Sequence, residues 1–350
     1  MVCTRRDFGK TAISALPAAA ALSLPGLGLA LPNSKITGVQ IGVITYSLRQ
    51  GIAKADLPAV IAKIGLSSVE LMSGDAEAMA GAPAIPAGRG GGGRGASGTA
   101  SGAAGASGGR GAGGGGRAPL TPEQVAAQAA ARQALTDWRA AATPATWQGV
   151  RKQFNDQGVD LQILCYNMGV NIADDEIDYA FRMAQAMGVR GISSSSTVSV
   201  ARRVAPFAEK YKIMWGGHGH NNITDPEQFG TEESFEKIME FGNYIGANLD
   251  VGHYNQTGAD AVAFIQRHHD RITNVHIKDS TRPAVTGTVS NTLTPWGEGD
   301  APIGRVLLLM RKERYPFPAN IEFEYQIPAG SDAVTEVGKC LDFVKACLAT

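Results

Sequence analysis

From residue 39 to its end, the chain alternates between two kinds of apolar segment. Short runs rich in Val, Ile and Leu are typical of strands buried on both faces, and each is followed by a segment with the apolar period of a helix. Neighbouring parallel strands need a crossover of helix length, so the alternation predicts a parallel sheet. We expect eight strands, at 39–47, 67–72, 159–167, 189–195, 211–220, 247–253, 272–279 and 319–325.

The helices expected between these strands begin at recognisable signals. Two of them open with Thr-Pro, in which Thr can cap the helix and Pro suits its first turn. Eight strand–helix units are the number in a closed (β/α)8 TIM barrel, which we predict as a single domain over residues 36–348. An open doubly wound sheet is the alternative, but no glycine-rich phosphate loop follows the first strand. The expected helices are 56–65, 121–142, 143–158, 174–188, 197–210, 231–246, 258–269, 303–315 and 332–348.

The composition narrows the range of partners. Of 350 residues, 44% are hydrophobic and 18% charged, and the formal net charge is zero. This is enough apolar material for one large core. A neutral chain has no overall electrostatic attraction to nucleic acid or to an anionic membrane, so we expect a small-molecule partner and no nucleic acid. The cysteines lack the spacing of a metal site, and we expect them to be small core residues.

Residues 1–30 have the layout of an export signal. Arg5 and Arg6 precede a run of small apolar residues that ends in Gly-Leu-Ala, and Phe8 and Lys10 follow the arginine pair. This arrangement resembles the twin-arginine type. It predicts export to the periplasm and no stable membrane association after the signal is cleaved. An uncleaved membrane anchor is the alternative, although the run is rich in Ala and Gly and contains prolines.

Residues 81–118 are mostly Gly, Ala and Ser with a few Arg. Such a segment has no apolar period and cannot bury enough surface to offset the entropy of ordering it. We therefore predict a disordered insertion within the barrel. RNA binding through its arginines is the alternative, but no aromatic residues are interleaved with them.

Ionisable side chains gather where the predicted strands end. In a barrel the C-terminal strand ends converge on one rim, and alternate residues of a strand share a face. His276 and Lys278 can therefore both point inward, as can Glu322 and Glu324. The full set, in strand order, is Glu70, His218, His220, Asn221, Asp250, His253, His276, Lys278, Glu322 and Glu324.

So many acids and imidazoles in one place need a counter-charge, and a divalent cation is the simplest one. Mixed imidazole and carboxylate ligation suits Mn, Zn, Co or Fe rather than Ca. His268 and His269 are interpreted differently. They end a predicted helix, where a protonated histidine favours the helix dipole, so we expect them to be structural.

Six short stretches carry a resemblance to a known family: GLSSVEL, HGHN, LDVGH, NVHIKD, WGEGD and IEFEY. Over about residues 36–348, apart from the insertion, the chain resembles the sugar-phosphate isomerase/epimerase family of xylose isomerase-like barrels. The resemblance implies one metal ligand from each of strands five to eight. Those ligands would be His218, Asp250, His276 and Glu324.

The resemblance also implies roles for the residues around the metal. His253 would contact substrate, and Lys278 and Glu70 would line the pocket. The chain departs from the family's epimerases in strand five, where they have a glutamate and this chain has the imidazoles of His-Gly-His. Whether His218 or His220 is the ligand there stays open, and both can face the pocket.

The expected function is that of a metal-dependent sugar isomerase or epimerase. Glu322 or Glu324 would remove a proton next to a carbonyl, and an ene-diolate would be held by the metal and Lys278. His220, His253 or Glu70 would return the proton or expel a leaving group.

Other functions and properties stay open at this stage. Elimination by a lyase or dehydratase acting on a 3-keto-glycoside or keto-sugar is the first alternative. A phosphodiesterase of the abasic-site endonuclease type is the second, disfavoured by the neutral charge and the small number of histidines. A catalytically silent sugar-binding barrel is the third. The sugar, the metal and the oligomeric state stay open, with a homo-oligomer among the alternatives.

Overall fold

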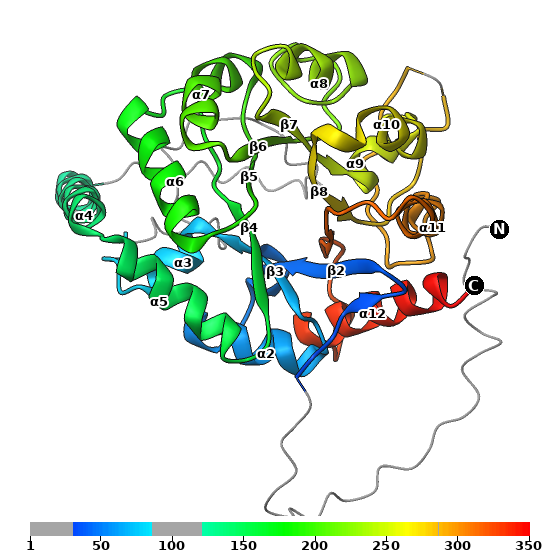
Figure 1. Cartoon of the computed structure of the whole chain (residues 1–350), viewed down its shortest axis with the longest axis horizontal. Coiled ribbons are helices and arrows are strands. Elements are labelled where there is room, and N and C mark those ends of the chain that lie inside the picture. Colours follow the sequence, from blue (N-terminus) through cyan, green and yellow to red (C-terminus); the bar gives the residue numbers. More distant parts are fainter. Residues whose placement is uncertain (1–30, 86–120, 286) are drawn as a thin grey trace, which may run out of the picture.

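The computed structural model describes residues 31–85, 121–285 and 287–350. Eight parallel strands, β2 to β9, pair in sequence order, and β9 pairs back with β2, so the sheet closes on itself. Figure 1 shows these strands at the centre of the molecule with the helices around them. The predicted (β/α)8 TIM barrel is therefore confirmed.

All eight predicted strands are present, mostly a few residues shorter than expected. An additional two-residue strand, β1 (Lys35–Ile36), pairs antiparallel with β2 outside the barrel. The barrel strands are β2 (Val39–Ile44), β3 (Ser68–Met72), β4 (Asp160–Cys165), β5 (Gly191–Ser194), β6 (Met214–His218), β7 (Ile245–Asp250), β8 (Ile272–Ile277) and β9 (Ala319–Ile321).

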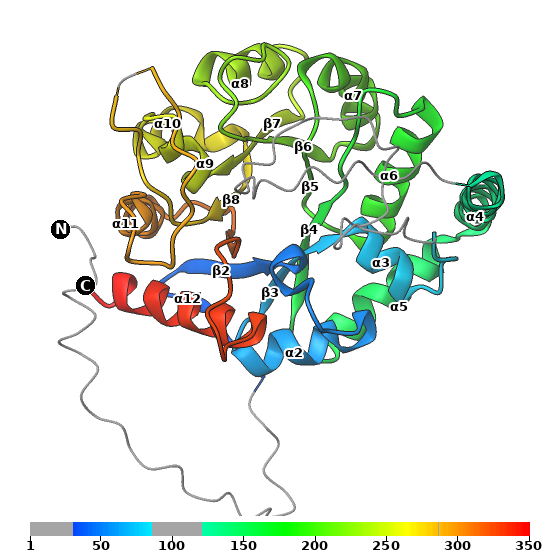
Figure 2. The same cartoon turned by 180° about the vertical axis from the view of Figure 1, so that it is seen from behind.

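The outer helices bury their apolar faces against the barrel, and this interface forms the main core. The last helix, α12, packs beside α2, so the last and first outer helices of the barrel are neighbours (Figure 2). The three cysteines among the described residues are buried, and Cys340 and Cys347 belong to this core. The outer helices are α2 (Leu57–Ile64), α5 (Pro144–Asn155), α6 (Asp174–Met187), α7 (Val198–Tyr211), α8 (Glu232–Met239), α10 (Ala261–His268), α11 (Ile303–Glu313) and α12 (Ala333–Leu348).

Two short helices that follow strands directly were not predicted. They are α3 (Ser73–Met79), after β3, and α9 (Val251–Gln256), after β7. The helix expected at 231–246 ends at Met239, and β7 begins at Ile245 and ends at Asp250. His253 therefore lies in α9 rather than at the end of a strand.

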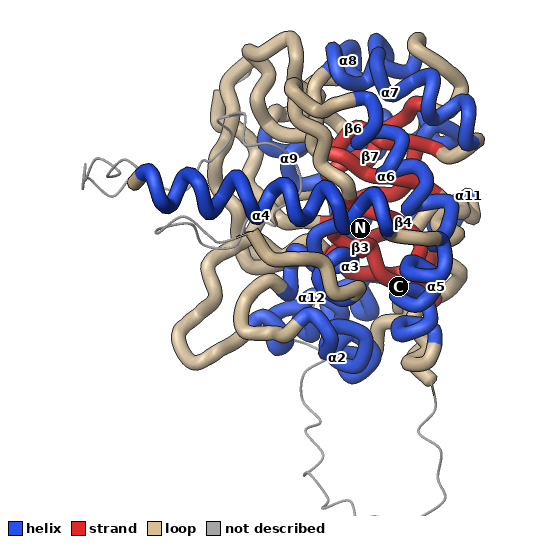
Figure 3. Tube along the Cα trace, turned by 90° about the vertical axis from the view of Figure 1, so that its left-hand side faces the viewer, coloured by secondary structure: helices blue, strands red, loops and turns tan. Residues whose placement is uncertain are grey.

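The long helix α4 (Pro122–Ala141) is mostly exposed, and Leu135 is its one buried residue. Figure 3 shows α4 extending beyond the loops on one side of the barrel. Near its C-terminal end, the Arg139 guanidinium lies 2.7 Å from Glu77 of α3 and 2.9 Å from Glu176 of α6. This ion-pair group attaches α4 to the barrel wall.

Two predicted segments fall on parts of the chain for which the structure gives no description. The export signal at 1–30 lies outside the described residues, as do residues 86–118 of the predicted insertion. Within the described ranges, no helix combines the length and the apolar character needed to cross a membrane.

Candidate metal centre

Four consecutive barrel strands bring four buried ligand side chains to one point. His218 and Asp250 are the last residues of β6 and β7, His276 lies in β8, and Glu322 follows β9 directly. The register pairs Asp250 with His276 across β7 and β8. One ligand atom from each of the four side chains lies within 4.8 Å of the others, and all four are buried. The strand ends therefore converge as expected for a barrel rim.

The unpaired atoms of this group test whether a divalent ion fits. Nδ1 of His218 is buried and has no hydrogen-bond partner among the described residues. Oδ2 of Asp250 lies 2.9 Å from the Lys278 ammonium but has no hydrogen bond of normal geometry. Buried polar atoms left in this way cost free energy, which coordination would recover. Two imidazoles and two carboxylates form the donor set preferred by Mn, Zn, Co and Fe.

Three of these ligands are held in the protonation state that a metal requires. Burial and the neighbouring His276 lower the pKa of His218 to about 3, so its imidazole is neutral. Burial opposes ionisation of Asp250, but Lys278 and His253 outweigh it and lower the pKa of that carboxyl. In the same way, Lys278 and His276 outweigh burial and hold the pKa of Glu322 well below its usual range. Metal binding needs neutral imidazole and ionised carboxylate, so these groups are ready to coordinate.

His276 lies between two carboxylates. Its Nε2 is 2.8 Å from Oε2 of Glu70, and its Nδ1 is 2.9 Å from Oε2 of Glu322. Burial disfavours the charged ring, but Glu70 and Glu322 overcome that effect and raise the pKa of His276 well above its ordinary value. In the metal-free protein this ring is therefore an imidazolium, and an incoming ion would replace its proton.

Lys278 supplies the main positive charge of the centre. Its Nζ lies 2.5 Å from Glu324, 2.9 Å from Asp250, 3.0 Å from Glu322 and 3.1 Å from Nε2 of His253. Burial opposes its charge, but the three carboxylates raise the pKa of Lys278 well above the ordinary value. The ammonium therefore stays charged beside the ligand group.

Glu324 lies outside the four-ligand group, although the resemblance implies it as the fourth ligand. Strand β9 ends at Ile321, and its register pairs Asn320 with His276 of β8. Glu322 follows directly, and its Oε2 lies 2.9 Å from Nδ1 of His276. Glu324 is two residues further along, roughly 7 Å in an extended chain. Its side chain is 21% exposed, and its Oε2 is 3.8 Å from Nε2 of His253. The geometry thus places Glu322 among the ligands and Glu324 at the solvent-facing side.

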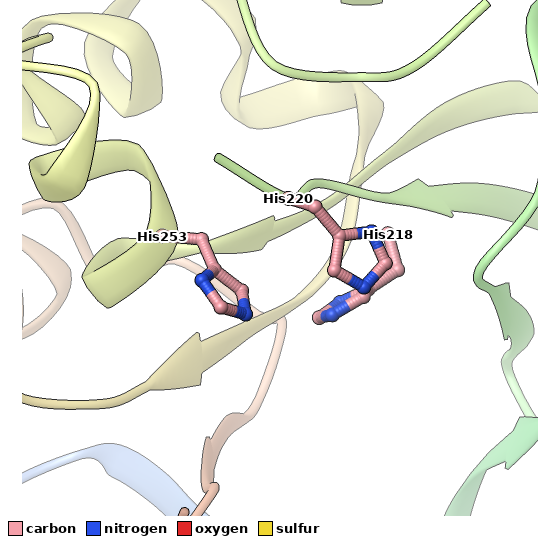
Figure 4. Close-up of side chains that lie close together, drawn as sticks. All are labelled: His218, His220 and His253. Carbon is pink, nitrogen blue, oxygen red and sulfur yellow. The ribbon is translucent and has the colours of Figure 1, made fainter. Parts of the chain in front are cut away.

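Three histidines form a second group, which shares His218 with the four candidate ligands. One ring nitrogen from each of His218, His220 and His253 lies within 4.8 Å of the others. Figure 4 shows the rings of His218 and His220 close together, with His253 approaching from α9. Of the two histidines of the His-Gly-His stretch, His218 joins the buried carboxylates, whereas His220 is half-buried and faces His253.

The ring of His253 is held in one orientation. Its Nδ1 lies 2.8 Å from Oε1 of Gln256, an oxygen that can only accept, so Nδ1 carries the proton. Nε2 is then an acceptor and receives a hydrogen bond from Lys278. His253 therefore presents a basic nitrogen beside Glu324 and Lys278.

Glu70 was expected to line the pocket, but the structure places it beneath the ligands. Its side chain is completely buried in the barrel interior. It cannot contact a substrate there, because side chains of β5, β8 and β9 surround it. A pocket position was expected from the resemblance and from the position of Glu70 near the end of the second predicted strand. The sequence does not show how deep in the barrel it lies.

Sequence reasoning missed two features of this rim. Tyr46 follows β2 in the 3-10 helix η1 (Thr45–Leu48), and Arg49 stacks on its ring at 4.1 Å. Burial and the charge of Glu324 raise the pKa of the Tyr46 hydroxyl, which places it near the site. The sequence could have indicated Tyr46, because it is an aromatic residue near the end of the first predicted strand, 39–47.

The Trp-Gly-Glu-Gly-Asp stretch has a structural explanation. The carboxylate of Asp279 accepts backbone N–H groups from Gly297 at 2.8 Å and Gly299 at 3.1 Å. A side chain at Gly299 would collide with Asp279. These bonds fold the loop after β8 back onto the barrel.

The comparisons with known proteins agree with this architecture. Residues 195–347, which include all four buried ligands, match the family model described as "Xylose isomerase-like TIM barrel". No curated protein matches the chain.

Three solved structures illustrate the likeness. D-psicose 3-epimerase in the presence of D-fructose is 12% identical, with a TM-score of 0.56, over 89% of this chain and 100% of the other. A sugar phosphate isomerase/epimerase from Parabacteroides distasonis is 14% identical, with a TM-score of 0.51, over 95% and 98%. The probable 3-DHS dehydratase AsbF from Bacillus anthracis is 12% identical, with a TM-score of 0.51, over 89% and 98%. At these identities the likeness establishes the fold alone, which is a TIM barrel.

Proposed function

We propose that this protein is a metal-dependent enzyme that removes a proton next to a sugar carbonyl and so isomerises or epimerises the sugar. The observation that carries the proposal is the buried group of His218, Asp250, His276 and Glu322, whose ligand atoms lie within 4.8 Å of one another. The printed names of two structures with this fold, an epimerase and an isomerase/epimerase, support the same reaction class.

The four buried residues would hold the divalent ion, which supplies Lewis-acid polarisation of the sugar carbonyl when it is bound. Glu324 is the best-placed base. It is partly exposed, lies outside the ligand group, and is beside both Lys278 and His253. Its carboxylate takes the proton from the carbon next to the carbonyl, the C–H electron pair forms a C=C double bond, and the C=O π pair moves onto the carbonyl oxygen. The Lys278 ammonium balances the negative charge that develops on the sugar.

The proton must then return to the substrate. Return by Glu324 to the former carbonyl carbon, with transfer of the hydroxyl proton to the former carbonyl oxygen, would exchange the positions of carbonyl and hydroxyl, which is isomerisation. Return to the opposite face of the original carbon would be epimerisation. Nε2 of His253 lies only 3.8 Å from Glu324, on the same side as the base, so His220 is the candidate for that step. The hydrogen bond that Nδ1 of His253 donates to Gln256 holds the ring so that Nε2 faces Lys278 and can exchange a proton with it.

Elimination is the second candidate, and one observation favours it. Asp250 and Glu322 lie in the buried ligand group, which leaves Glu324 as the partly exposed carboxylate of this cluster, facing imidazoles rather than a second free carboxylate. One base and a nearby acid suit the loss of a hydroxyl or glycosyl oxygen from a 3-keto-glycoside or keto-sugar. The base takes the proton, the C–H pair forms the new double bond, and the leaving oxygen receives a proton from His220 or His253.

The test uses the full chain loaded in turn with Mn, Zn, Co and Fe. Each form is incubated in deuterated water with a panel of free and 3-oxidised sugars. Deuterium in the recovered or isomerised sugar supports isomerisation or epimerisation, and an unsaturated product supports elimination. Both should disappear in Glu324→Gln. Absence of exchange and of product with every metal and sugar would overturn the proposal.

We also propose that residues 1–30 direct export, supported by the adjacent Arg5 and Arg6 before a small-residue apolar run. Replacing both arginines by lysine should leave the protein in the cytoplasm with an unprocessed N-terminus. Cell fractionation followed by N-terminal sequencing measures this. A periplasmic, processed double variant would contradict a twin-arginine signal.

A further inference from the structure

A fully buried carboxylate lies beneath the metal centre. Glu70, on β3, accepts hydrogen bonds at Oε2 from Asn274 at 2.8 Å and from Asn320 at 2.7 Å, and at Oε1 from the hydroxyl of Ser193. The fourth contact is Nε2 of His276, 2.8 Å from Oε2. A buried charge is costly unless hydrogen bonds surround it, and here three strands of the barrel supply them.

This arrangement sets the proton on one ring nitrogen of His276. An ionised carboxylate only accepts hydrogen bonds, so the nitrogen that faces Glu70, Nε2, carries a hydrogen. The amide nitrogen of Asn248 also approaches Nε2, at 3.2 Å, but the contact with Glu70 is shorter and carries charge. Nδ1 points the other way, to within 2.9 Å of Glu322 in the ligand group.

We propose that Glu70 is a positioning residue that keeps the hydrogen of His276 on Nε2 and thereby presents Nδ1 to the metal ion. The inference rests on the proposed metal centre. A carboxylate behind a ligating imidazole fixes the orientation of the ring and makes the coordinating nitrogen more basic. The asparagines and Ser193 hold Glu70 itself in place, so its geometry does not depend on the ion.

The first experiment measures the coordinating nitrogen directly in the wild-type protein. The full chain, labelled with ¹⁵N-histidine and loaded with Zn²⁺, is studied by NMR, with His276→Gln to assign the signals. The expected result is a His276 ring whose Nε2 bears a hydrogen and whose Nδ1 is bound to zinc. Zinc bound at Nε2 would overturn the inference. A wild-type protein that binds no zinc would overturn both the inference and the metal centre, so the two failures are distinguishable.

The second experiment compares substitutions of Glu70 by their effect on metal affinity. Glu70→Gln keeps an acceptor but removes the charge, and Glu70→Ala removes both. Dissociation constants from chelator competition should rise about tenfold for Gln and about 100-fold for Ala. The visible spectrum of the Co²⁺-loaded protein should change in the same order.

Glu336→Gln is the matched control. Glu336 is also buried, but it lies on α12 and accepts bonds from Tyr325, Ser331 and Lys339, away from the centre. Its substitution should alter stability without altering metal affinity or the Co²⁺ spectrum. Glu70 variants that bind metal as tightly as wild type, with the wild-type spectrum, would show that Glu70 has only a structural role.

Discussion

Glu322 and Glu324 are two residues apart and both contact Lys278, but their surroundings give them different chemistry. Glu322 is buried against the His276 ring, whereas Glu324 is partly exposed beside His253. A metal ligand should be fixed in position and shielded from water, whereas a base that contacts the substrate must be accessible. We therefore assign coordination to Glu322 and proton transfer to Glu324.

Glutamine substitutions at these two positions should separate the two roles. Glu322→Gln removes the charge from a ligand and should weaken metal binding about 100-fold or more. Glu324→Gln should bind metal with nearly wild-type affinity but lose deuterium exchange into substrate. Metal content after dialysis and exchange rates measure the two effects. The reverse pattern would restore Glu324 as the ligand, as the resemblance implies.

Metal binding should release about one proton per ion at pH 7. The raised pKa of His276, caused by Glu70 and Glu322 against the effect of burial, makes its ring an imidazolium in the metal-free protein. His218, with a pKa of about 3, and the ionised Asp250 and Glu322 contribute no proton. Calorimetry in buffers of different ionisation enthalpy measures the release. Heats that do not depend on the buffer would contradict it.

At the scale of elements, the sequence was most informative where a segment was long and periodic. All eight barrel strands were predicted because β-branched runs such as Val39–Ile44 differ clearly from the helical segments around them. The short helices α3 and α9 were missed because six or seven residues with glycine and polar side chains have no visible period. The helix α9 matters for the site, since Asp250 caps it by accepting the N–H of His253 at 2.8 Å.

The sequence also identified only some of the candidate metal ligands. Strand order places the ionisable groups at one rim, so the sequence could predict that His218, Asp250 and His276 meet. It could not choose between Glu322 and Glu324, because both face inward and the choice depends on where β9 ends. It also could not place Glu70, since strand alternation gives a side chain's direction but not its depth in the barrel.

The first turn of α9 packs tightly on β8, which makes a direct prediction about Gly252. A Cβ at Gly252 would lie 2.8 Å from both Cβ and the carbonyl oxygen of Lys278. Gly252→Ala should therefore destabilise the protein by about 1–3 kcal/mol and weaken metal binding, because it pushes Lys278 and Asp250 apart. Urea unfolding and metal titration measure the two effects.

Gly338→Ala is the control for this substitution. Gly338 is also helical, in α12, and a Cβ there meets nothing within 4 Å. Alanine at this position should stabilise the protein by about 0.5–1 kcal/mol through helix propensity. If Gly252→Ala behaved like Gly338→Ala, the contact between α9 and β8 would be looser than the structure has it.

At the scale of the whole molecule, barrel closure brings together residues that are distant in the chain. Glu70 and Asn320 are 250 positions apart and share a hydrogen bond of 2.7 Å. This contact between β3 and β9 beneath the centre therefore forms only when the barrel closes through the pairing of β2 with β9. Conversely, an ion bound to residues of β6, β7 and β8 and to Glu322 stabilises the closed barrel, by about 2.7 kcal/mol at a free concentration of 100 times Kd.

Closure also buries groups whose titration must affect the stability of the metal-free protein. His218 has a folded pKa of about 3, and an unfolded histidine titrates near 6.5. Because the folded pKa is depressed, the stabilisation of the folded protein by His218 is complete above about pH 6.5 and is lost as the pH falls towards 3. The raised pKa of His276 acts oppositely: its contribution is complete below about pH 6.5 and is lost as the pH rises through the folded value.

Between about pH 6.5 and 4.5, the unfolded chain therefore takes up a proton at His218 that the folded protein does not. In this window His218 should lower the free energy of unfolding by up to about 1.4 kcal/mol per pH unit. The half-buried His220, whose pKa burial also lowers, adds a contribution of the same sign. Asp250 and Glu322 stay ionised in both states over most of the window, because their folded pKa values are lowered.

Urea midpoints of the chelator-treated protein should therefore fall on acidification, and they should fall less in His218→Asn. Equal slopes for wild type and His218→Asn would mean that this ring is solvated in the metal-free barrel and is not the dry neutral ligand that the structure places there.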